Sequence, residues 1–100
     1  MAKKQIITPQ AQRDLDSAYH WYQKQSKGLG KDFIRCVDAT LATVFRYPFH
    51  NQVIFKNVVR RALVKRFPYA IYFVSEEDST TIFAILDQRR NPEIWQERIE

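Results

Sequence analysis

Cysteine is almost absent from the sequence, because Cys36 is the only one in 100 residues. A single cysteine excludes a disulfide within the chain and any metal site built from several cysteines, and it suits a reducing compartment. The sequence also lacks the ~20-residue apolar run of a membrane-spanning helix, and its basic N-terminus lacks the apolar segment of a signal peptide. We therefore expect a cytoplasmic protein that has no membrane partner.

Acidic residues are missing from the centre of the chain. No Asp or Glu occurs between residues 39 and 75, although the whole chain contains 11 acidic and 16 basic residues. The cations inside this acid-free stretch are Arg46, Lys56, Arg60, Arg61, Lys65 and Arg66. Together with the net charge of +5, this distribution indicates a polyanionic or acidic partner, because net charge bears on association more than on fold.

Histidine and glycine are also scarce. His20 and His50 are the only histidines, and neither stands at a metal-ligand spacing from Cys36 or from acidic residues. We therefore expect no metal site and no cofactor, and we expect Cys36 to be a small, partly buried thiol rather than a nucleophile. Glycine-rich phosphate loops are absent, since both glycines, Gly28 and Gly30, fall within three positions.

What the sequence does contain is enough apolar material for one packed core. Apolar residues make up 45% of the chain and aromatic residues 14%, which is typical of a globular domain and not of a disordered chain. A chain of 100 residues has room for one such core. We predict a single domain over residues 1–100.

The first half of the chain predicts a short strand and a helix hairpin. Residues 5–8 are rich in β-formers, and Thr8 and Pro9 then supply an N-cap and a proline at the first helical position. The apolar residues at helical spacing are Ala11, Leu15, Ala18 and Tyr22 in the first helix, and Phe33, Val37, Leu41 and Val44 in the second. The glycines in residues 26–30 predict the tight turn between them, and Pro48 ends the second helix.

The second half predicts four strands and a short terminal helix. Residues 53–55, 58–67, 69–74 and 80–86 are rich in β-branched and aromatic side chains, and residues 93–98 follow Pro92 as a helix. Short turns between the strands favour an antiparallel meander. The predicted fold is therefore α+β, with an N-terminal strand and a helix hairpin packed on one face of a mainly antiparallel twisted sheet. Because strands 69–74 and 80–86 are apolar on both faces, we expect a partner chain to cover the other face.

Two groups of cations are candidates for a binding surface. Alternation along the strand 58–67 places Arg60 and Arg66 on one face and Arg61 and Lys65 on the other, and guanidinium groups suit phosphate or carboxylate partners. The alternative is an ordinary solvated strand whose cations deter edge aggregation.

The second group is Arg89 and Arg90, directly after the last strand. We expect Arg90 to converge on Arg60 or Arg61, unless this segment only starts the final helix. We expect Trp95 to pack that helix against the sheet.

The most specific combination in the sequence is an arginine-rich strand that runs into Arg66-Phe67-Pro68-Tyr69, followed by Arg90-Asn91-Pro92 and Trp95. It is accompanied by Thr8-Pro9, Ala11, Asp14-Leu15, Trp21-Tyr22, Phe33 and Pro48 in the first half, and by residues 60–65 and 70–72, Ala84-Ile85-Leu86 and Arg98 in the second. This succession, which covers nearly the whole chain, resembles the RelE/ParE superfamily of type II toxins. The fold of that family, a helix hairpin on an antiparallel sheet, agrees with the predicted plan.

The resemblance implies a toxin that arrests growth and is neutralised by an antitoxin from an adjacent gene, in systems that stabilise plasmids. An antitoxin segment wrapped over the toxin would account for the strands that are apolar on both faces. The superfamily has two activities. ParE-like members poison DNA gyrase and are not known as enzymes, whereas RelE-like members cleave mRNA in the ribosome.

Ribonuclease chemistry needs a base for the 2′-hydroxyl, an acid for the leaving oxygen and cations to hold the phosphate. RelE-like ribonucleases often carry a Tyr or His near the C-terminus, and this chain has neither after Leu86. Many relatives have a His where this chain has Asp87, which would serve as a base only if its pKa were raised; His50 is the other candidate for proton transfer. The catalytic set under this alternative is Arg61, Lys65, Asp87 and Arg90.

We therefore favour a ParE-like toxin that inhibits DNA gyrase and is not an enzyme. The alternatives are a RelE-like ribosome-dependent mRNA endoribonuclease and an inactive relative kept as a binding module. The expected partners are a cognate antitoxin and DNA gyrase, or the ribosome and mRNA under the first alternative. The residues expected to contact them are Arg60, Arg61, Lys65, Arg66, Tyr72, Arg89, Arg90 and Trp95.

Overall fold

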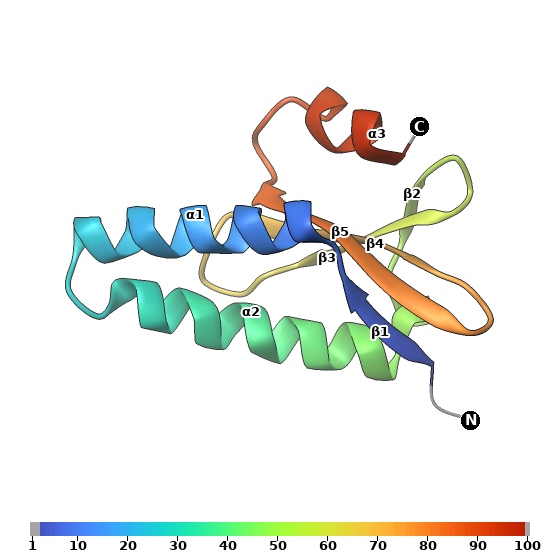
Figure 1. The fold of residues 1–100 in the computed structure, drawn as a ribbon, viewed down its shortest axis with the longest axis horizontal. Coiled ribbons are helices and arrows are strands. Elements are labelled where there is room, and N and C mark those ends of the chain that lie inside the picture. The colour runs from blue at the N-terminus through green and yellow to red at the C-terminus, as the bar shows by residue number, and fades with distance from the viewer. Residues whose placement is uncertain (1–2, 100) are drawn as a thin grey trace.

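The computed structural model describes residues 3–99 as a strand, a helix hairpin, four more strands and a final helix (Figure 1). The helices are α1 (Pro9–Gln25), α2 (Leu29–Arg46) and α3 (Glu93–Ile99), with a short 3-10 turn, η1 (Pro48–His50). The strands are β1 (Lys4–Ile7), β2 (Val53–Phe55), β3 (Val59–Leu63), β4 (Tyr69–Ser75) and β5 (Ser79–Asp87). None of the helices within residues 3–99 has the length and apolar character needed to cross a membrane.

The strands form one mixed sheet in the order β1-β5-β4-β3-β2. The last four strands pair antiparallel as a meander, and β1 adds to the free edge of β5 in the parallel direction. A parallel neighbour needs a crossover connection, and here the helix hairpin and strands β2 to β4 together form the connection between β1 and β5. The predicted α+β fold with a mainly antiparallel sheet is confirmed.

The helix hairpin forms where its caps and apolar stripes predict it. The Thr8 side chain accepts a hydrogen bond from the Ala11 N–H at 3.2 Å, and Pro9 opens α1. Gly28 has a φ of 87°, a conformation that glycine adopts without a Cβ clash, and α2 follows at once. The eight predicted stripe residues of the two helices are all buried.

The core between the hairpin and the sheet ends in an aromatic cluster near the hairpin turn. The Tyr22 ring lies 5.0 Å from Phe33 and 4.9 Å from Phe67, and Tyr69 lies 4.9 Å from Phe33, measured between ring centroids. The pairs of Tyr22 with Phe67 and of Tyr69 with Phe33 are edge-to-face, which is a favoured arrangement of aromatic rings. The cluster attaches the turn of the hairpin to the connection between β3 and β4.

The opposite face of the sheet carries a second core, which α3 covers (Figure 1). The Trp95 ring stacks on Tyr72 with centroids 4.8 Å apart and meets Phe55 edge-on at 5.4 Å. The packing role predicted for Trp95 is confirmed. The partner chain expected on this face is not needed for its apolar strands, because α3 of the same chain covers them.

Tyr72 and Trp95 are only 2% and 7% exposed. This burial corrects the expectation that they contact a partner. They hold α3 on the sheet and are not part of the surface that a partner would meet.

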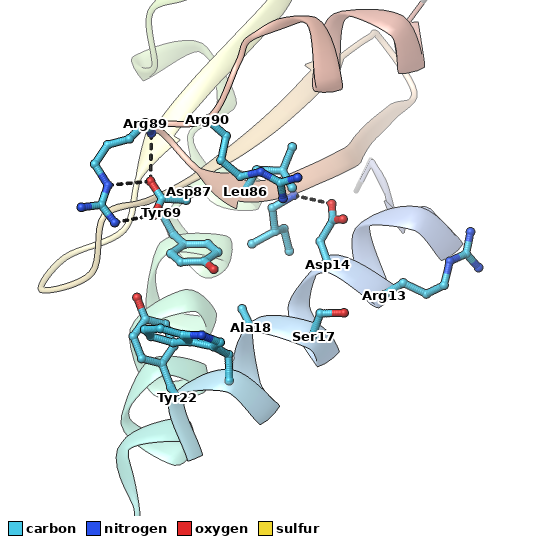
Figure 2. Close-up of a pocket in the computed structure, with 12 residues that line it drawn as sticks. Arg13, Asp14, Ser17, Ala18, Tyr22, Tyr69, Leu86, Asp87, Arg89 and Arg90 are labelled. Carbon is cyan, nitrogen blue, oxygen red and sulfur yellow. Dashed lines mark hydrogen bonds and ion pairs between the residues drawn. The ribbon is translucent and has the colours of Figure 1, made fainter. Parts of the chain in front are cut away.

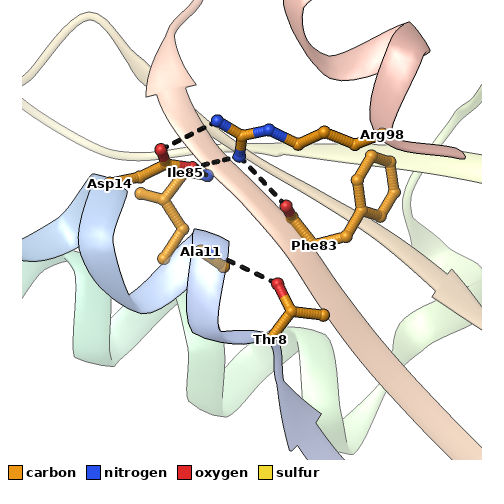
Figure 3. A network of polar contacts seen from close by, with 6 residues as sticks. All are labelled: Thr8, Ala11, Asp14, Phe83, Ile85 and Arg98. Atoms are coloured by element: carbon orange, nitrogen blue, oxygen red, sulfur yellow. Dashed lines mark hydrogen bonds and ion pairs between the residues drawn. The ribbon is translucent and has the colours of Figure 1, made fainter.

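A polar network ties α3 to α1 across the end of the sheet (Figure 3). Arg98 donates from Nη1 to Asp14 Oδ2 at 2.6 Å and from Nη2 to Asp14 Oδ1 at 3.0 Å, and Nη1 also donates to the Phe83 carbonyl at 3.2 Å. Asp14 Oδ2 accepts a further hydrogen bond from the Ile85 N–H at 3.0 Å. The network connects both helical layers with β5.

β3 is shorter than the predicted strand of residues 58–67, because it covers only Val59–Leu63. Arg66 has a φ of 72°, and a residue in the left-handed region ends the alternation of faces along a strand. The predicted pairs, Arg60 with Arg66 and Arg61 with Lys65, are therefore wrong. Only Arg60 and Arg61 lie in the strand, on opposite faces, while the other two cations belong to the connection to β4.

Candidate functional site at the basic end of the sheet

The connection from β3 to β4 and the connection from β5 to α3 lie side by side. Tyr69 at the start of β4 pairs with Asp87 at the end of β5, and the Gln88 N–H donates to the Pro68 carbonyl at 2.9 Å. Each connection carries two exposed cations. We call these four residues, Lys65, Arg66, Arg89 and Arg90, the basic end of the sheet.

The register contradicts the expected convergence of Arg90 on Arg60, whereas convergence on Arg61 stays a prediction. Since β3 and β5 are both antiparallel to β4, their C-terminal ends lie at the same end of the sheet. Arg90 therefore comes near the residues that follow β3. Arg60 lies at the other end, where its Nη1 donates to the Asn51 carbonyl at 2.6 Å and its guanidinium lies 5.1 Å from the centre of the Phe49 ring.

Arg61 lies on the α3 face and pairs with Tyr72 of β4. Burial raises the pKa of the Tyr72 hydroxyl, and the charge and hydrogen bonding of Arg61 oppose that rise. The Arg61 guanidinium therefore interacts with Tyr72 at the border of the second core. Arg60 and Arg61 thus lie on opposite faces of the sheet.

Asp87 is held tightly by Arg89. Arg89 Nε donates to Asp87 Oδ1 at 3.0 Å, Nη2 donates to Oδ2 at 2.6 Å, and the Arg89 backbone N–H donates to Oδ1 at 2.9 Å. The side-chain hydrogen bonds from Arg89 are the main cause of a lowered pKa at Asp87. The raised pKa that a general base would need is therefore contradicted, because every bond to this carboxylate favours its charged form.

A pocket of about 420 Å³ lies between α1 and the end of β5 (Figure 2). Figure 2 shows Tyr69 and Tyr22 on one side of it, with Ser17 and Ala18 of α1 turned toward the same space. The cations that line it are Arg13, Arg89 and Arg90, and the indole of Trp21 contributes a further wall. We call it the α1–β5 pocket. Arg89 and Arg90, the second cation group of the sequence, therefore line the same pocket as residues of α1.

Tyr22 and Tyr69 give this pocket protonated hydroxyl groups. Burial is the largest cause of a raised pKa at both side chains, and the charge of Asp87 acts in the same direction. Because the ordinary value is 10.0, both phenols stay neutral at physiological pH and keep their donor capacity.

Sequence reasoning did not include Arg13 or Trp21 in the site. Both residues lie on α1 outside its buried stripe. The sequence signal that could have found the site is a tryptophan at such a position, because a large exposed indole suggests a binding surface.

A second concavity of about 540 Å³ lies between α2 and β3. Its walls include Thr40 and Leu63, with Lys65 and Arg66 at its border. Cys36 also lines it and is half-buried, as expected for this thiol. The basic end therefore stands between two hollows, one on each side of the helix hairpin.

The histidines and acidic residues form no metal site in the described part of the chain. No group of three or more His, Cys, Asp or Glu side chains within residues 3–99 is placed to hold an ion. His50 stacks on Tyr47 with ring centroids 5.0 Å apart, and His20 meets Tyr19 edge-on at 5.2 Å. His50 belongs to η1 and not to the basic end.

Comparisons with known proteins agree with this fold. The family model described as "ParE toxin of type II toxin-antitoxin system, parDE" matches residues 6–92. A solved structure described as the chromosomal ParDE TA system from P. aeruginosa superimposes with a TM-score of 0.72 and 17% sequence identity, covering 83% of this chain and 92% of that chain. The comparison with curated proteins gave no match. Because the family match spans the hairpin, strands β2 to β5 and the second half of β1, the chain belongs to the family of ParE toxins of type II toxin–antitoxin systems.

Proposed function

We propose that this ParE-family toxin arrests growth in the cytoplasm by inhibiting DNA gyrase, and that a cognate antitoxin neutralises it. The observation that carries the proposal is the family match over residues 6–92, which includes the helix hairpin and strands β2 to β5 in full. Plasmid stabilisation would follow from such a pair, because cells that lose the genes would lose the antitoxin.

The contacts that the candidate catalytic residues already make favour gyrase over mRNA as the target. A ribonuclease site needs its base, its acid and its phosphate-binding cations within reach of one phosphate. Here Arg61 lies beside Tyr72, Lys65 borders the α2–β3 hollow, and Asp87 is ion-paired with Arg89. This arrangement suits a binding surface better than an acid–base site.

The basic end is the surface that we expect gyrase to meet. Its cations come from two adjacent connections on a rigid sheet, and connections of this kind commonly carry function. Arg89 and Arg90 extend from the loop after β5, and Lys65 and Arg66 from the loop after β3. An antitoxin that brings acidic side chains to the same end would block the contact through charge complementarity.

A paired assay tests the target. The purified toxin is added to a gyrase supercoiling reaction and, separately, to translating ribosomes whose mRNA ends are mapped. We expect supercoiling to be lost and the mRNA to stay intact. Clean mRNA breaks with unaffected gyrase would establish the ribonuclease alternative, and no effect in either reaction would favour an inactive binding module.

Variants locate the surface. We expect the double variant Lys65→Ala/Arg66→Ala and the single variant Arg90→Ala to weaken gyrase inhibition by about tenfold or more, as removal of charged contacts does. Lys4→Ala is the matched control, since this exposed lysine of β1 pairs with Ser79 at the other end of the sheet. Equal loss in the control would show that net charge, and not the basic end, governs inhibition.

A further inference from the structure

Trp21 is exposed where a tryptophan is usually buried. It is 56% exposed on α1, one position before the buried Tyr22, and its ring meets Tyr22 edge-on with centroids 5.0 Å apart. An indole has a large apolar face that is normally removed from water in a core or an interface. This face borders the α1–β5 pocket, so a ligand there can cover it.

Two guanidinium groups of the same pocket have no acidic partner among residues 3–99. Arg13 and Arg90 line it, and no carboxylate of residues 3–99 lies within ion-pair distance of either. The two carboxylates that line the pocket are already engaged. Asp14 pairs with Arg98 and Asp87 with Arg89. The pocket therefore presents two guanidinium groups that no described carboxylate holds in an ion pair.

The pocket also has donors between the indole and the cations. The Ser17 hydroxyl and the neutral phenols of Tyr22 and Tyr69 line it, and Figure 2 shows Arg90 and the Tyr69 ring on the β5 side, facing α1. Its volume of about 420 Å³ falls within the usual range for small-molecule sites.

We propose that the α1–β5 pocket binds a nucleotide, with the base against Trp21 and the phosphate between Arg13 and Arg90. A planar base matches an exposed indole, because every base has a stacking face whatever its sequence. A phosphate matches two free guanidiniums, which bind such groups through paired hydrogen bonds. The nucleotide can be free or part of an unpaired strand, and the proposal is independent of the target of the toxin.

Intrinsic fluorescence gives a direct test, because the chain has two tryptophans and the other, Trp95, is buried in the second core. The full chain is titrated with deoxyadenosine 5′-monophosphate, with deoxyadenosine, with inorganic phosphate and with a single-stranded oligodeoxyadenylate, and calorimetry repeats each titration. We expect saturable quenching by the nucleotide, retained in Trp95→Phe, and about tenfold or weaker binding of the nucleoside or phosphate alone. If the oligonucleotide binds more tightly than the mononucleotide, the site is assigned to an unpaired strand. If the two bind equally, the site is assigned to a free nucleotide.

Substitutions test each half of the site. We expect each of the variants Trp21→Ala, Arg13→Ala and Arg90→Ala to weaken nucleotide binding by about tenfold, while thermal melting shows that the domain stays folded. Binding to Trp21→Ala is measured by calorimetry, because this variant lacks the reporting fluorophore. The matched controls are Phe49→Ala and Arg46→Ala, an exposed aromatic and an exposed cation at the far end of α2. Both should bind as the unmodified chain does.

Three results would overturn the proposal. One is the absence of saturable binding by the nucleotide and the oligonucleotide. Another is phosphate binding as tight as nucleotide binding, which would make the pocket a simple anion site. The third is unchanged affinity in Trp21→Ala. Because none of these readouts involves gyrase, failure here leaves the proposed function standing, and loss of gyrase inhibition leaves the nucleotide site standing.

Discussion

The ion pair of Asp14 and Arg98 should be the polar contact whose loss destabilises the domain most. The side chains of Asp14 and Arg98 are 11% and 17% exposed, so solvent screens their interaction little. Asp14→Ala removes the bidentate partner of Arg98 and the acceptor of the Ile85 N–H together. Breaking a buried pair from one side costs about 3–5 kcal/mol, because the remaining charge is left buried and uncompensated.

That loss is large beside the total stability of a domain, which is about 5–15 kcal/mol. In a domain of this size each 1 kcal/mol moves the melting temperature by about 4–8 °C, so Asp14→Ala should melt at least about 12 °C lower. Arg98→Ala leaves Asp14 with the Ile85 N–H, and the double variant should be less destabilised than the sum of the two single ones. Their coupling energy should be about 1–3 kcal/mol.

Urea unfolding followed by circular dichroism and by tryptophan fluorescence measures these differences. The control is Arg35→Ala, which breaks the pair with Asp32 at 3.7 Å, where the side chains are 79% and 41% exposed. An exposed pair of this kind contributes about 0–1 kcal/mol. If Asp14→Ala and Arg35→Ala lowered the free energy of unfolding by the same small amount, the reasoning from burial and geometry would be refuted.

Three further predictions concern the hairpin and the loop after β5. Thr8→Ala removes the side-chain cap of α1 and should cost about 1 kcal/mol, seen in thermal melting, while Thr8→Ser should keep most of it. Gly30→Ala should cost about 1–3 kcal/mol in urea unfolding, because its Cβ would lie 2.8 Å from the Tyr19 carbonyl oxygen; stability equal to the unmodified chain would contradict this close approach. Arg89 lowers the Asp87 pKa below its ordinary 3.8, so the stabilisation is present above pH 3.8 and is lost as pH falls through the lowered pKa. The stability difference from Asp87→Asn should shrink over that acidic window, and a difference independent of pH would contradict it.

Several elements could be predicted from the sequence because their signals are local. The Thr8 cap with its proline, the glycines of the hairpin turn and the eight apolar stripe residues each act within a few positions along the chain, and all are found as predicted. The family resemblance rests on the same residues and is confirmed by the match over residues 6–92. The packing of Trp95 was also predictable, since a large aromatic near a chain end usually anchors a helix.

The errors arose where the outcome depends on strand register and backbone conformation. Alternation predicts opposite faces for Lys65 and Arg66 only while a strand continues, and β3 ends at Leu63, before both residues. The pKa of Asp87 depends on a partner two residues away that has to fold back onto it, and neither spacing nor composition records that turn.

The sequence by itself determined the class of fold, the helix boundaries, the family and the presence of a strongly basic surface, because periodicity, caps and charge are properties of short segments. Only the tertiary structure decided which cations lie at the same end of the sheet. It placed Arg60 and Arg61 on opposite faces of β3, laid the connection after β3 beside the connection after β5, and placed Trp21 at the same pocket as Arg90. The physical reason is that these neighbours are set by the pairing of β4 with β5 and by the packing of α1 on the sheet, which are contacts between distant parts of the chain.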